Sequence, residues 1–454
     1  MNRWSWQCLD CRSALRPEVG GLRCSGCRRL YPILSGVPIL VGDPSLYVTS
    51  EIASLRRGAE DARQKASFLD RVAGDLGLTG AAIDRHRDVL DAEIAQIETL
   101  LGLIEPLAAP AEGKAGGRRS SGWGFDGLLH YLLRDWLGTP ELDAQCAAIG
   151  AAVARVLPDP GEKTVIFAGC GAGGLVARLA GGFGRAIGFD LALPFLVAAR
   201  RLLDGGTLDV AVSKTLHASG RVSLGGTKAA PVGLLAMDAF DTAFPDGVAD
   251  CVVTAFFLDL LPDPRKLAAE IHRILAAGGV WINYGPSGPM KALWRFDGAE
   301  MQAFLETSGF APIEIEALRA TYLDLSREFP SWGYRSHVCT LTAARKAGPP
   351  ASPPETPPSL VDLPDIIPEN LPGAVLVRRH PLTGDRSAKI VLHHERIAGR
   401  SESFDVSEEM ADLLALVDGK CSLQDIVSPL DRPEEAVQLF ADGFRRGLLT
   451  WRRA

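Results

Sequence analysis

Short apolar runs alternate with amphipathic stretches along the chain from residue 163 onward. The predicted strands are residues 164–168, 186–189, 233–236, 250–255 and 280–284, and the predicted helices are residues 173–180, 193–203 and 264–275. The runs have the length of buried strands, and the amphipathic stretches have helical spacing. This alternation is typical of parallel strands joined by crossover helices. We therefore predict an α/β fold with a Rossmann-like sheet.

The rest of the chain divides into segments of different character. Residues 50–105 and 128–156 have helical spacing, whereas residues 108–124 are rich in Ala, Gly, Ser and Arg, as in a loop. Residues 347–358 hold six prolines in twelve positions, which predicts an extended linker. We place the domain boundaries at 1–45, 46–127, 128–346, 347–359 and 360–454.

Composition narrows the class of protein. Of the 454 residues, 47% are hydrophobic and 23% are charged, which suits a globular chain. The formal net charge of -7 offers no overall attraction to phosphate backbones, so nucleic acid is an unlikely partner. Neither a signal peptide nor a membrane-spanning apolar run is recognisable. Five scattered cysteines in apolar contexts suit a reducing compartment, and we predict a cytoplasmic protein.

Four cysteines near the start form two CxxC pairs. Cys8 and Cys11 are separated from Cys24 and Cys27 by twelve residues, and each pair can give two thiolates to one tetrahedral zinc ion. Two disulfides or four unrelated thiols are the alternative. Four protein ligands close the coordination shell, so the predicted zinc is structural. The first 45 residues resemble the small zinc-ribbon proteins that activate tRNA and translation-factor methyltransferases, which implies a scaffolding zinc ribbon.

A glycine-rich loop follows the first predicted strand of the sheet. Gly169, Gly171 and Gly174 permit a tight turn and a close approach of a ligand to the backbone. Asp190 ends the next strand, where a carboxylate can bind ribose hydroxyls. This loop alone does not distinguish a dinucleotide from S-adenosylmethionine, and a glycine turn without a ligand is a third possibility.

Residues 163–286 resemble the class I methyltransferases, whose cofactor is S-adenosylmethionine. The motifs are "VIFAGCGAGGLVARL", "AIGFD" and "MDAFDTAFPDGVADCVVTAFFLDLLPDPRKLAAEIHRILAAGGVWINYGP". The resemblance implies that Asp238 lies by the adenine and that Ala239 offers a backbone N–H. It also makes Gly169, Gly171, Gly173, Asp190 and Ala255 cofactor-binding candidates.

A narrower resemblance is to the carnosine N-methyltransferase family, which methylates a histidine ring nitrogen in a small peptide. The motifs are "LLRDW", "VVTAFFLDLL" and "GGVWINYGP", with a weaker one in "ATYLDLSREFPSWGYRSHVCTLTAARK". The resemblance implies that Arg134 reaches the carboxylate of the cofactor's methionine part and that Asp259 holds the imidazole. The alternatives are purely structural: Arg134 and Asp135 would form a surface ion pair, and Asp259 would cap a helix.

The chemistry of imidazole gives a separate reason for an aspartate in such a site. The attacking nitrogen must be neutral, and a carboxylate that accepts the other N–H fixes the tautomer. Methyl transfer then depends chiefly on orientation. Tyr322, Tyr334 and His337 are candidates for the substrate pocket, although aromatic residues are as often part of a core. The family's histidine after "GP" is missing here, and Tyr131 replaces a glutamine.

The C-terminal segment resembles the PqqD-like domains that recognise precursor peptides. The motifs are "VLVRRHPL", "KIVLHHERIAGRSESFDVSEEMADLLALVDGKCSLQDIV" and "AVQLFADGFRRGLLTW". The resemblance implies a winged-helix-like fold that takes up a peptide as an added strand. A DNA-binding winged helix and a purely structural appendage are the alternatives.

Together these features predict an S-adenosylmethionine-dependent N-methyltransferase that acts on a histidine-type side chain of a peptide. The predicted peptide is a ribosomally made precursor held by the C-terminal domain. Two other functions stay open. One is a small-molecule methyltransferase for carnosine-like compounds, and the other is a non-catalytic peptide-binding scaffold with a methyltransferase fold. The sequence identifies neither the peptide nor the methylated atom, and it leaves the oligomeric state open.

Overall fold

The chain forms two compact units in a computed structural model, and each is described by itself. The first unit lies within residues 1–352, and the second is built mainly by residues 353–454. The structure describes residues 6–104, 125–215, 218–226, 232–261, 264–287, 296–324, 334–350, 366–370, 374–379, 389–396, 400–406 and 408–430, together with 433, 436–437, 439–440 and 449–453. The predicted loop at 108–124 and most of the proline-rich linker lie outside the described residues.

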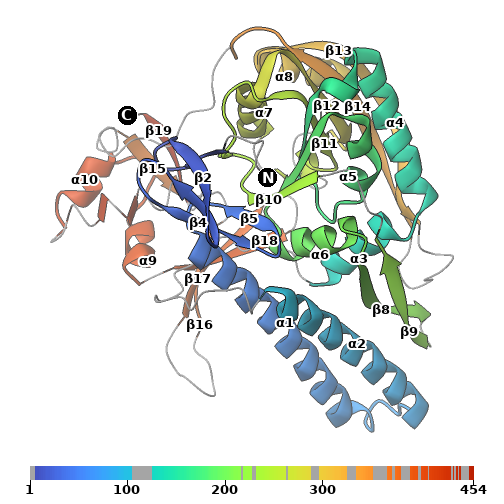
Figure 1. Ribbon diagram of the computed structural model, residues 1–454. Helices are drawn as coiled ribbons and strands as arrows, with labels where there is room; N and C mark the ends of the chain where they lie inside the picture. The colour runs from blue at the N-terminus through green and yellow to red at the C-terminus, as the bar shows by residue number, and fades with distance from the viewer. Residues whose placement is uncertain are drawn as a thin grey trace. The chain divides into compact units, whose positions relative to one another are not determined.

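The first unit contains the following helices and strands (Figure 1). Its strands are β1 (Trp6–Gln7), β2 (Ala14–Glu18), β3 (Gly21–Cys24), β4 (Leu30–Leu34), β5 (Val37–Leu40), β6 (Thr164–Ala168), β7 (Arg185–Asp190), β8 (Thr207–Thr215), β9 (Ala218–Gly225), β10 (Val232–Met237), β11 (Ala249–Ala255), β12 (Leu275–Gly285), β13 (Phe310–Asp324) and β14 (Tyr334–Lys346). Its helices are α1 (Pro44–Val72), α2 (Gly80–Ile104), α3 (Phe125–Trp136), α4 (Pro140–Val156), α5 (Gly174–Leu179), α6 (Leu193–Leu203), α7 (Pro264–Ile274) and α8 (Gly298–Thr307).

One large sheet organises this unit. Its strand order is β1-β2-β3-β4-β5-β10-β7-β6-β11-β12-β14-β13. The strands from β5 through β12 pair in parallel, and β14 runs antiparallel to both of its neighbours. Each predicted strand of the α/β region and each predicted helix is present, within a few residues of its expected ends. The predicted α/β Rossmann-like fold is therefore confirmed.

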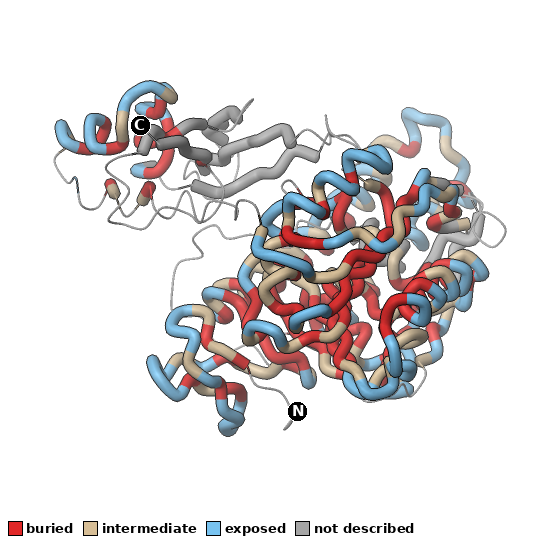
Figure 2. Tube along the Cα trace, turned by 90° about the horizontal axis from the view of Figure 1, so that it is seen from above, coloured by how far each residue is buried: buried red, intermediate tan, exposed pale blue. Residues whose placement is uncertain are grey.

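Two apolar cores cover the two faces of the sheet. Side chains of α1, α2, α4 and α6 pack with Val165, Phe167, Val253 and Ile282 on one face. On the other face, α7 and α8 pack with Ile166, Val252 and Trp281. Figure 2 shows buried residues concentrated in the middle of this unit, with exposed residues on the outer helices. Because neighbouring residues of a strand point to opposite faces, central strands covered on both sides are apolar throughout.

The predicted helix over residues 128–156 is divided in two. Helix α3 ends at Trp136 and α4 begins at Pro140. Gly138 between them has a φ of 73°, a left-handed conformation that ends a helix, and Pro140 is suited to the first helical turn. This break turns the carboxyl end of α3 toward the sheet, where α3 contributes to the site.

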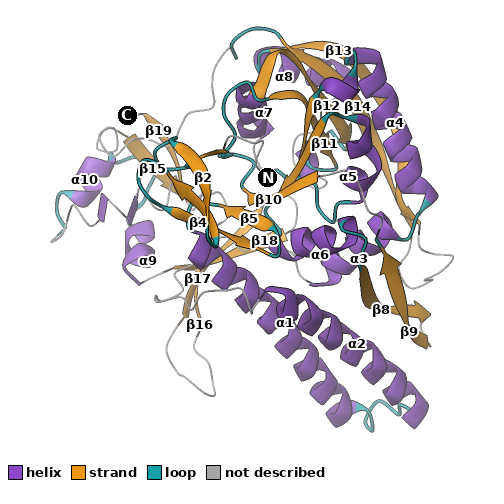
Figure 3. Cartoon of the chain, viewed as in Figure 1, coloured by secondary structure: helices purple, strands orange, loops and turns teal. Residues whose placement is uncertain are grey.

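The first five strands continue the same sheet. We call residues 6–40, which contain β1 to β5, the cysteine module; Figure 3 shows these strands among the other elements. Ile39 and Leu40 of β5 pair in parallel with Ala236 and Met237 of β10. This pairing could not be predicted from the sequence, because β5 is short and its apolar run resembles any buried strand.

The second unit combines small sheets with short helices. Strands β16 (Ala374–Arg379), β17 (Lys389–Arg396) and β18 (Arg400–Val406) form an antiparallel sheet, and β15 (Ile366–Asn370) pairs with β19 (Leu449–Arg453). Helices α9 (Glu408–Ala415) and α10 (Leu423–Val427) contribute to a core with Val417, Phe440 and Leu449. Among the described helices of the whole chain, none is long and apolar enough to cross a membrane.

Candidate functional site

Several strands end together at one edge of the sheet. In the parallel pairings, Ala168 of β6 lies opposite Phe189 of β7 and Thr254 of β11, and Asp190 lies opposite Ala236 of β10. We call this the carboxyl edge. Ligands of open α/β sheets bind outside the carboxyl ends of the strands, where the strand order reverses. Here the reversal falls between β6 and β11, so the loops after these strands are the candidate site.

The glycine loop after β6 has a backbone that only glycine adopts easily. Gly169, Gly171 and Gly173 have φ values of 68°, 52° and 84°. A Cβ at Gly169 would lie 2.4 Å from the Phe257 ring. Within the described part of the chain, no heavy atom other than those of Gly171 and its two chain neighbours lies within 4 Å of the corresponding position at Gly171. The loop is therefore closely packed on one side and open beside Gly171, as a ligand-binding turn requires.

Asp190 is bonded directly to this loop. One carboxylate oxygen accepts a hydrogen bond from the N–H of Gly171 at 2.8 Å, and the other accepts from Ala192 at 2.8 Å. Burial raises the pKa of Asp190, while these backbone donors oppose the rise. Each oxygen keeps a further lone pair that can accept from a ligand hydroxyl. Asp190 is thus fixed where it can bind a ribose.

The remaining predicted cofactor residues follow neighbouring strands. Asp238 comes directly after β10, and its carboxylate accepts from the N–H of Phe240 at 2.9 Å. Ala239 is buried beside it, and Ala255 is the last residue of β11. All three lie at the carboxyl edge, next to the strands that carry Asp190 and the glycine loop.

Arg134 and Asp135 reach the glycine loop from the end of α3. They form an ion pair of 3.0 Å, and Asp135 also accepts from the N–H of Gly174 at 2.9 Å. Because the two residues are only 8% and 4% exposed, the surface-pair interpretation is wrong. The guanidinium carbon of Arg134 lies 4.3 Å from the centre of the Tyr322 ring. Arg134 therefore connects the cofactor candidates with an aromatic cluster.

The aromatic cluster joins two of the predicted pocket residues. The rings of Tyr322 and His337 are 5.8 Å apart, and Phe256 packs edge-on against both, at 4.5 Å and 6.3 Å. Burial raises the pKa of Tyr322 well above its usual value, and the charge of Arg134 opposes this. Phe256 has a φ of 49°, an uncommon conformation for a bulky residue that concentrates at functional sites. The side chain of Tyr334 lies outside the described residues.

Asp259 occupies a 3-10 turn just beyond β11. The turn spans Leu258–Leu260, and Asp259 lies five residues before Pro264, the first residue of α7, so Asp259 is not the cap of that helix. Asp259 is buried, with 8% of the residue exposed. Burial raises the pKa of Cys339 on β14 to about 12, and the charge of Asp259 adds to this rise. His337 lies two residues earlier on the same strand and on the same side of it.

Three further residues of this site were not predicted from the sequence. The Tyr47 hydroxyl donates to the carbonyl of Leu191 at 2.5 Å, and burial, followed by the charges of Glu51 and Asp190, raises the pKa of Tyr47 well above its usual value. Gln145 is 1% exposed and hydrogen-bonds Arg134. Phe257 covers Gly169. Phe257 belongs to the stretch "VVTAFFLDLL", but nothing in that stretch distinguishes it from the other apolar residues, and Tyr47 and Gln145 lie outside every quoted motif.

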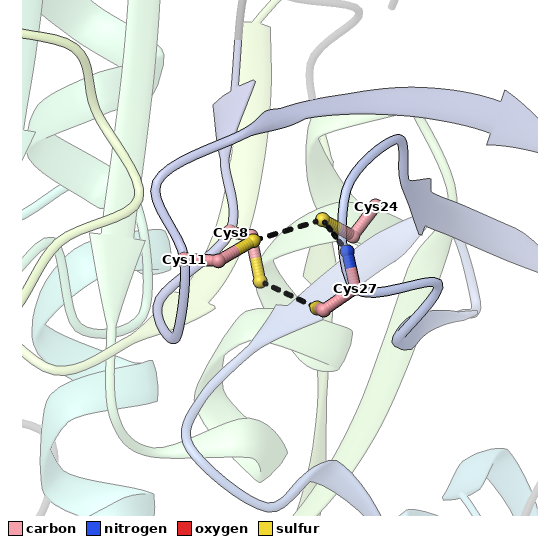
Figure 4. A group of neighbouring side chains, drawn as sticks. All are labelled: Cys8, Cys11, Cys24 and Cys27. Carbon is pink, nitrogen blue, oxygen red and sulfur yellow. Dashed lines mark hydrogen bonds between the residues drawn. The ribbon is translucent and has the colours of Figure 1, made fainter.

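The four predicted metal ligands lie together in the cysteine module (Figure 4). Their sulfur atoms are all within 4.8 Å of one another, with Cys8 and Cys27 at 3.6 Å and Cys11 and Cys24 at 3.4 Å. Zn–S bonds of about 2.3 Å place tetrahedral sulfurs about 3.8 Å apart. The N–H groups of Gly26 and Cys27 donate to the Cys24 sulfur at 3.3 Å and 3.4 Å. All four are free cysteines, and the set could hold a metal ion.

The strand order and the carboxyl edge define a Rossmann-like methyltransferase domain. Residues 167–282 match the family model of the methyltransferase domain, from the last strand residues before the glycine loop into β12. The matched segment contains Asp190, Asp238 and Asp259. The chain is therefore a methyltransferase by its catalytic domain, and the match supports binding of S-adenosylmethionine.

Solved structures of methyltransferases are similar to part of the chain. Phosphoethanolamine N-methyltransferase 2 of Haemonchus contortus, with S-adenosylmethionine, is 18% identical and covers 49% of this chain and 57% of its own, with a TM-score of 0.35. Magnesium protoporphyrin IX methyltransferase of Synechocystis is 16% identical over 45% of this chain and 78% of its own chain, with a TM-score of 0.31. A methyltransferase of Methanosarcina mazei is 15% identical over 43% of this chain and 96% of its own chain, with a TM-score of 0.32. No curated protein matches the chain significantly.

Proposed function

We propose that this protein transfers a methyl group from S-adenosylmethionine to a histidine-type ring nitrogen of a peptide held by the C-terminal unit. The observation that carries the proposal is that two groups lie together at one edge of the sheet: the glycine loop with Asp190, and the turn of the buried Asp259, which begins at Phe257 against Gly169. The first group suits an adenosyl cofactor, and the second suits a nitrogen heterocycle.

The cofactor half of the proposal assigns each group a binding role. Asp190 accepts from the ribose hydroxyls, Asp238 and the N–H of Ala239 bind the adenine, and the glycine loop and Ala255 border the sulfur. Arg134 binds the carboxylate of the methionine part. The open space beside Gly171 and the Nε of Arg134, which is buried and lacks a hydrogen-bond partner, fit a ligand of this shape and charge. When bound, the cofactor supplies an electrophilic methyl group on a sulfonium.

The substrate half depends on one carboxylate and the aromatic cluster. Asp259 accepts the N–H of the ring and leaves the other nitrogen neutral and directed at the methyl group. Tyr322 and His337 border the ring from β13 and β14, with Tyr334 as a further candidate. Since the reaction needs little acid catalysis, the rate depends on how well these groups hold the ring in line with the methyl group.

A PqqD-like role for the C-terminal unit would explain how a peptide is held. Among the described strands, β16 and β18 each pair only with β17, so a peptide strand can add to this sheet through backbone hydrogen bonds. A tethered substrate reaches an effective concentration in the millimolar range when the connection is short. We also propose that Cys8, Cys11, Cys24 and Cys27 bind a structural zinc ion, and that the protein functions in the cytoplasm.

The test uses the full-length protein, S-adenosylmethionine and short histidine-bearing peptides encoded near its gene. The proposal expects a mass increase of one methyl group on a histidine, and loss of the reaction with Asp259→Asn. Methylation of carnosine-like compounds that survives deletion of residues 347–454 would instead favour the small-molecule function. Calorimetry without any S-adenosylmethionine binding would favour the non-catalytic scaffold, and binding of duplex DNA by the C-terminal unit would favour a winged-helix reader.

A further inference from the structure

A continuous line of buried hydrogen bonds runs from the glycine loop to strand β13. The N–H of Gly174 donates to one oxygen of Asp135 at 2.9 Å, and Arg134 Nη1 donates to the other at 3.0 Å. Arg134 Nη2 donates to Gln145 Oε1 at 2.5 Å, and Gln145 Nε2 donates to the carbonyl of Thr321 at 3.1 Å. We call these four bonds the buried polar chain.

The buried polar chain places the Arg134 guanidinium between the cofactor half and the substrate half of the site. Its three side chains are 8% exposed or less, so each lost bond leaves a buried polar group unsatisfied. The Arg134 guanidinium stacks on Tyr322, the residue that follows Thr321, and its Nε has no hydrogen-bond partner. Two of its three nitrogens are therefore held by protein, and the third is left for a ligand.

Gln145 holds the Arg134 guanidinium in this orientation. A guanidinium can only donate and a carbonyl can only accept, so a side chain bridging them needs one acceptor and one donor at a fixed separation. Glutamine supplies both, and only one orientation of its amide satisfies both partners. Asp135 holds the other side of the guanidinium, and burial raises its pKa while the charge of Arg134 opposes the rise.

We propose that Gln145 is a positioning residue for cofactor recognition, which acts by aiming Arg134 at the carboxylate of the cofactor's amino-acid part. This inference rests on the proposed function, because it takes S-adenosylmethionine as the ligand. It goes beyond that function by assigning a role to a buried glutamine of α4 that does not line the glycine loop. Through its hydrogen bond to Thr321, Gln145 also connects the orientation of Arg134 with β13, the strand that carries Tyr322.

The experiment compares two ligands that differ only in the part that Arg134 would contact. S-adenosylhomocysteine carries the amino-acid group, whereas methylthioadenosine keeps the adenosine and the thioether and lacks it. With Gln145→Met, we expect the Kd of S-adenosylhomocysteine to rise about tenfold, the effect of one charge-assisted hydrogen bond, and that of methylthioadenosine to stay within about twofold. In an Arg134→Lys background, Gln145→Met should change neither Kd further.

Controls separate positioning from general damage. Gln96→Met removes a similarly buried glutamine, on α2 and outside the buried polar chain, and should leave the ratio of the two Kd values unchanged. If Gln145→Met does not fold, Gln145→Asn is used, because its shorter side chain cannot span both partners, and a selective loss of about threefold is expected. Equal weakening of both ligands, or no weakening, overturns the role of Gln145. Failure of the unaltered protein to bind S-adenosylhomocysteine would instead overturn the proposed function.

Discussion

The cofactor half and the substrate half of the site are built in different ways. The cofactor half consists mostly of backbone groups in one loop and of single residues at or just after the ends of β7, β10 and β11, and Arg134 from α3 completes it. The substrate half gathers side chains from the turn after β11 and from the pair β13 and β14, which are distant in sequence. The difference teaches that the cofactor half is encoded locally, whereas the substrate half depends on packing between elements. Substitutions should therefore separate the two halves.

The largest effect is expected at the centre of the cofactor half. Asp190→Ala removes the acceptor of the Gly171 and Ala192 N–H groups and of the ribose, so the Kd of S-adenosylmethionine should rise by about 100-fold or more. Calorimetry on the purified variant measures this. As a control, Asp204→Ala removes an exposed carboxylate paired with Arg200 and should leave binding unchanged. Unchanged binding in Asp190→Ala would show that the ribose is held elsewhere.

The next effect should fall on the substrate half alone. Asp259→Asn keeps the shape of the side chain but weakens the acceptor for a ring N–H, so kcat should fall by about 100-fold while the Kd of S-adenosylmethionine stays the same. Single-turnover kinetics with a histidine-bearing peptide measures the rate. A loss confined to cofactor binding would move Asp259 into the cofactor half and contradict this division.

The cysteine module borders the cofactor half, and its loss should affect that half more weakly. Arg12 donates to the carbonyl of Thr242, and the N–H of Gln7 donates to that of Ala243, in the loop that follows Asp238. Removing the metal by chelation, or Cys24→Ser, should lower the Tm by several degrees and raise the Kd of S-adenosylmethionine about threefold. Cys421→Ser, at an exposed free cysteine of the other unit, is the control. A protein without bound zinc, or one unaffected by its removal, contradicts the structural role.

The smallest effect concerns the contact between α1 and the cofactor half. Tyr47→Phe removes the hydrogen bond to Leu191 beside Asp190, so the Kd of S-adenosylmethionine should rise about twofold, equivalent to about 0.5 kcal/mol, with kcat unchanged. Tyr31→Phe removes a hydroxyl bonded within the cysteine module and should not change the Kd. Equal effects of the two variants would mean that Tyr47 only stabilises the fold.

The same contrast explains what the sequence could predict. The alternating strands and helices, the glycine loop and Asp190 were predictable because each depends on residues close together in the chain. The pairing of β5 with β10 was not, since strand pairing between distant segments leaves no local pattern. Gln145 has the same character: its partners lie eleven residues before it and 176 residues after it. The break at Gly138 could have been recognised from the sequence Leu-Gly-Thr-Pro, a helix stop followed by a helix start.

The most direct test of the account is a calorimetric titration of the full-length protein with S-adenosylhomocysteine and, in a separate experiment, with NADH. The account predicts binding of one S-adenosylhomocysteine per chain, lost in Asp190→Ala, and no binding of NADH. Binding of NADH, or the absence of any S-adenosylhomocysteine binding, would contradict the assignment of the carboxyl edge to a methyl donor.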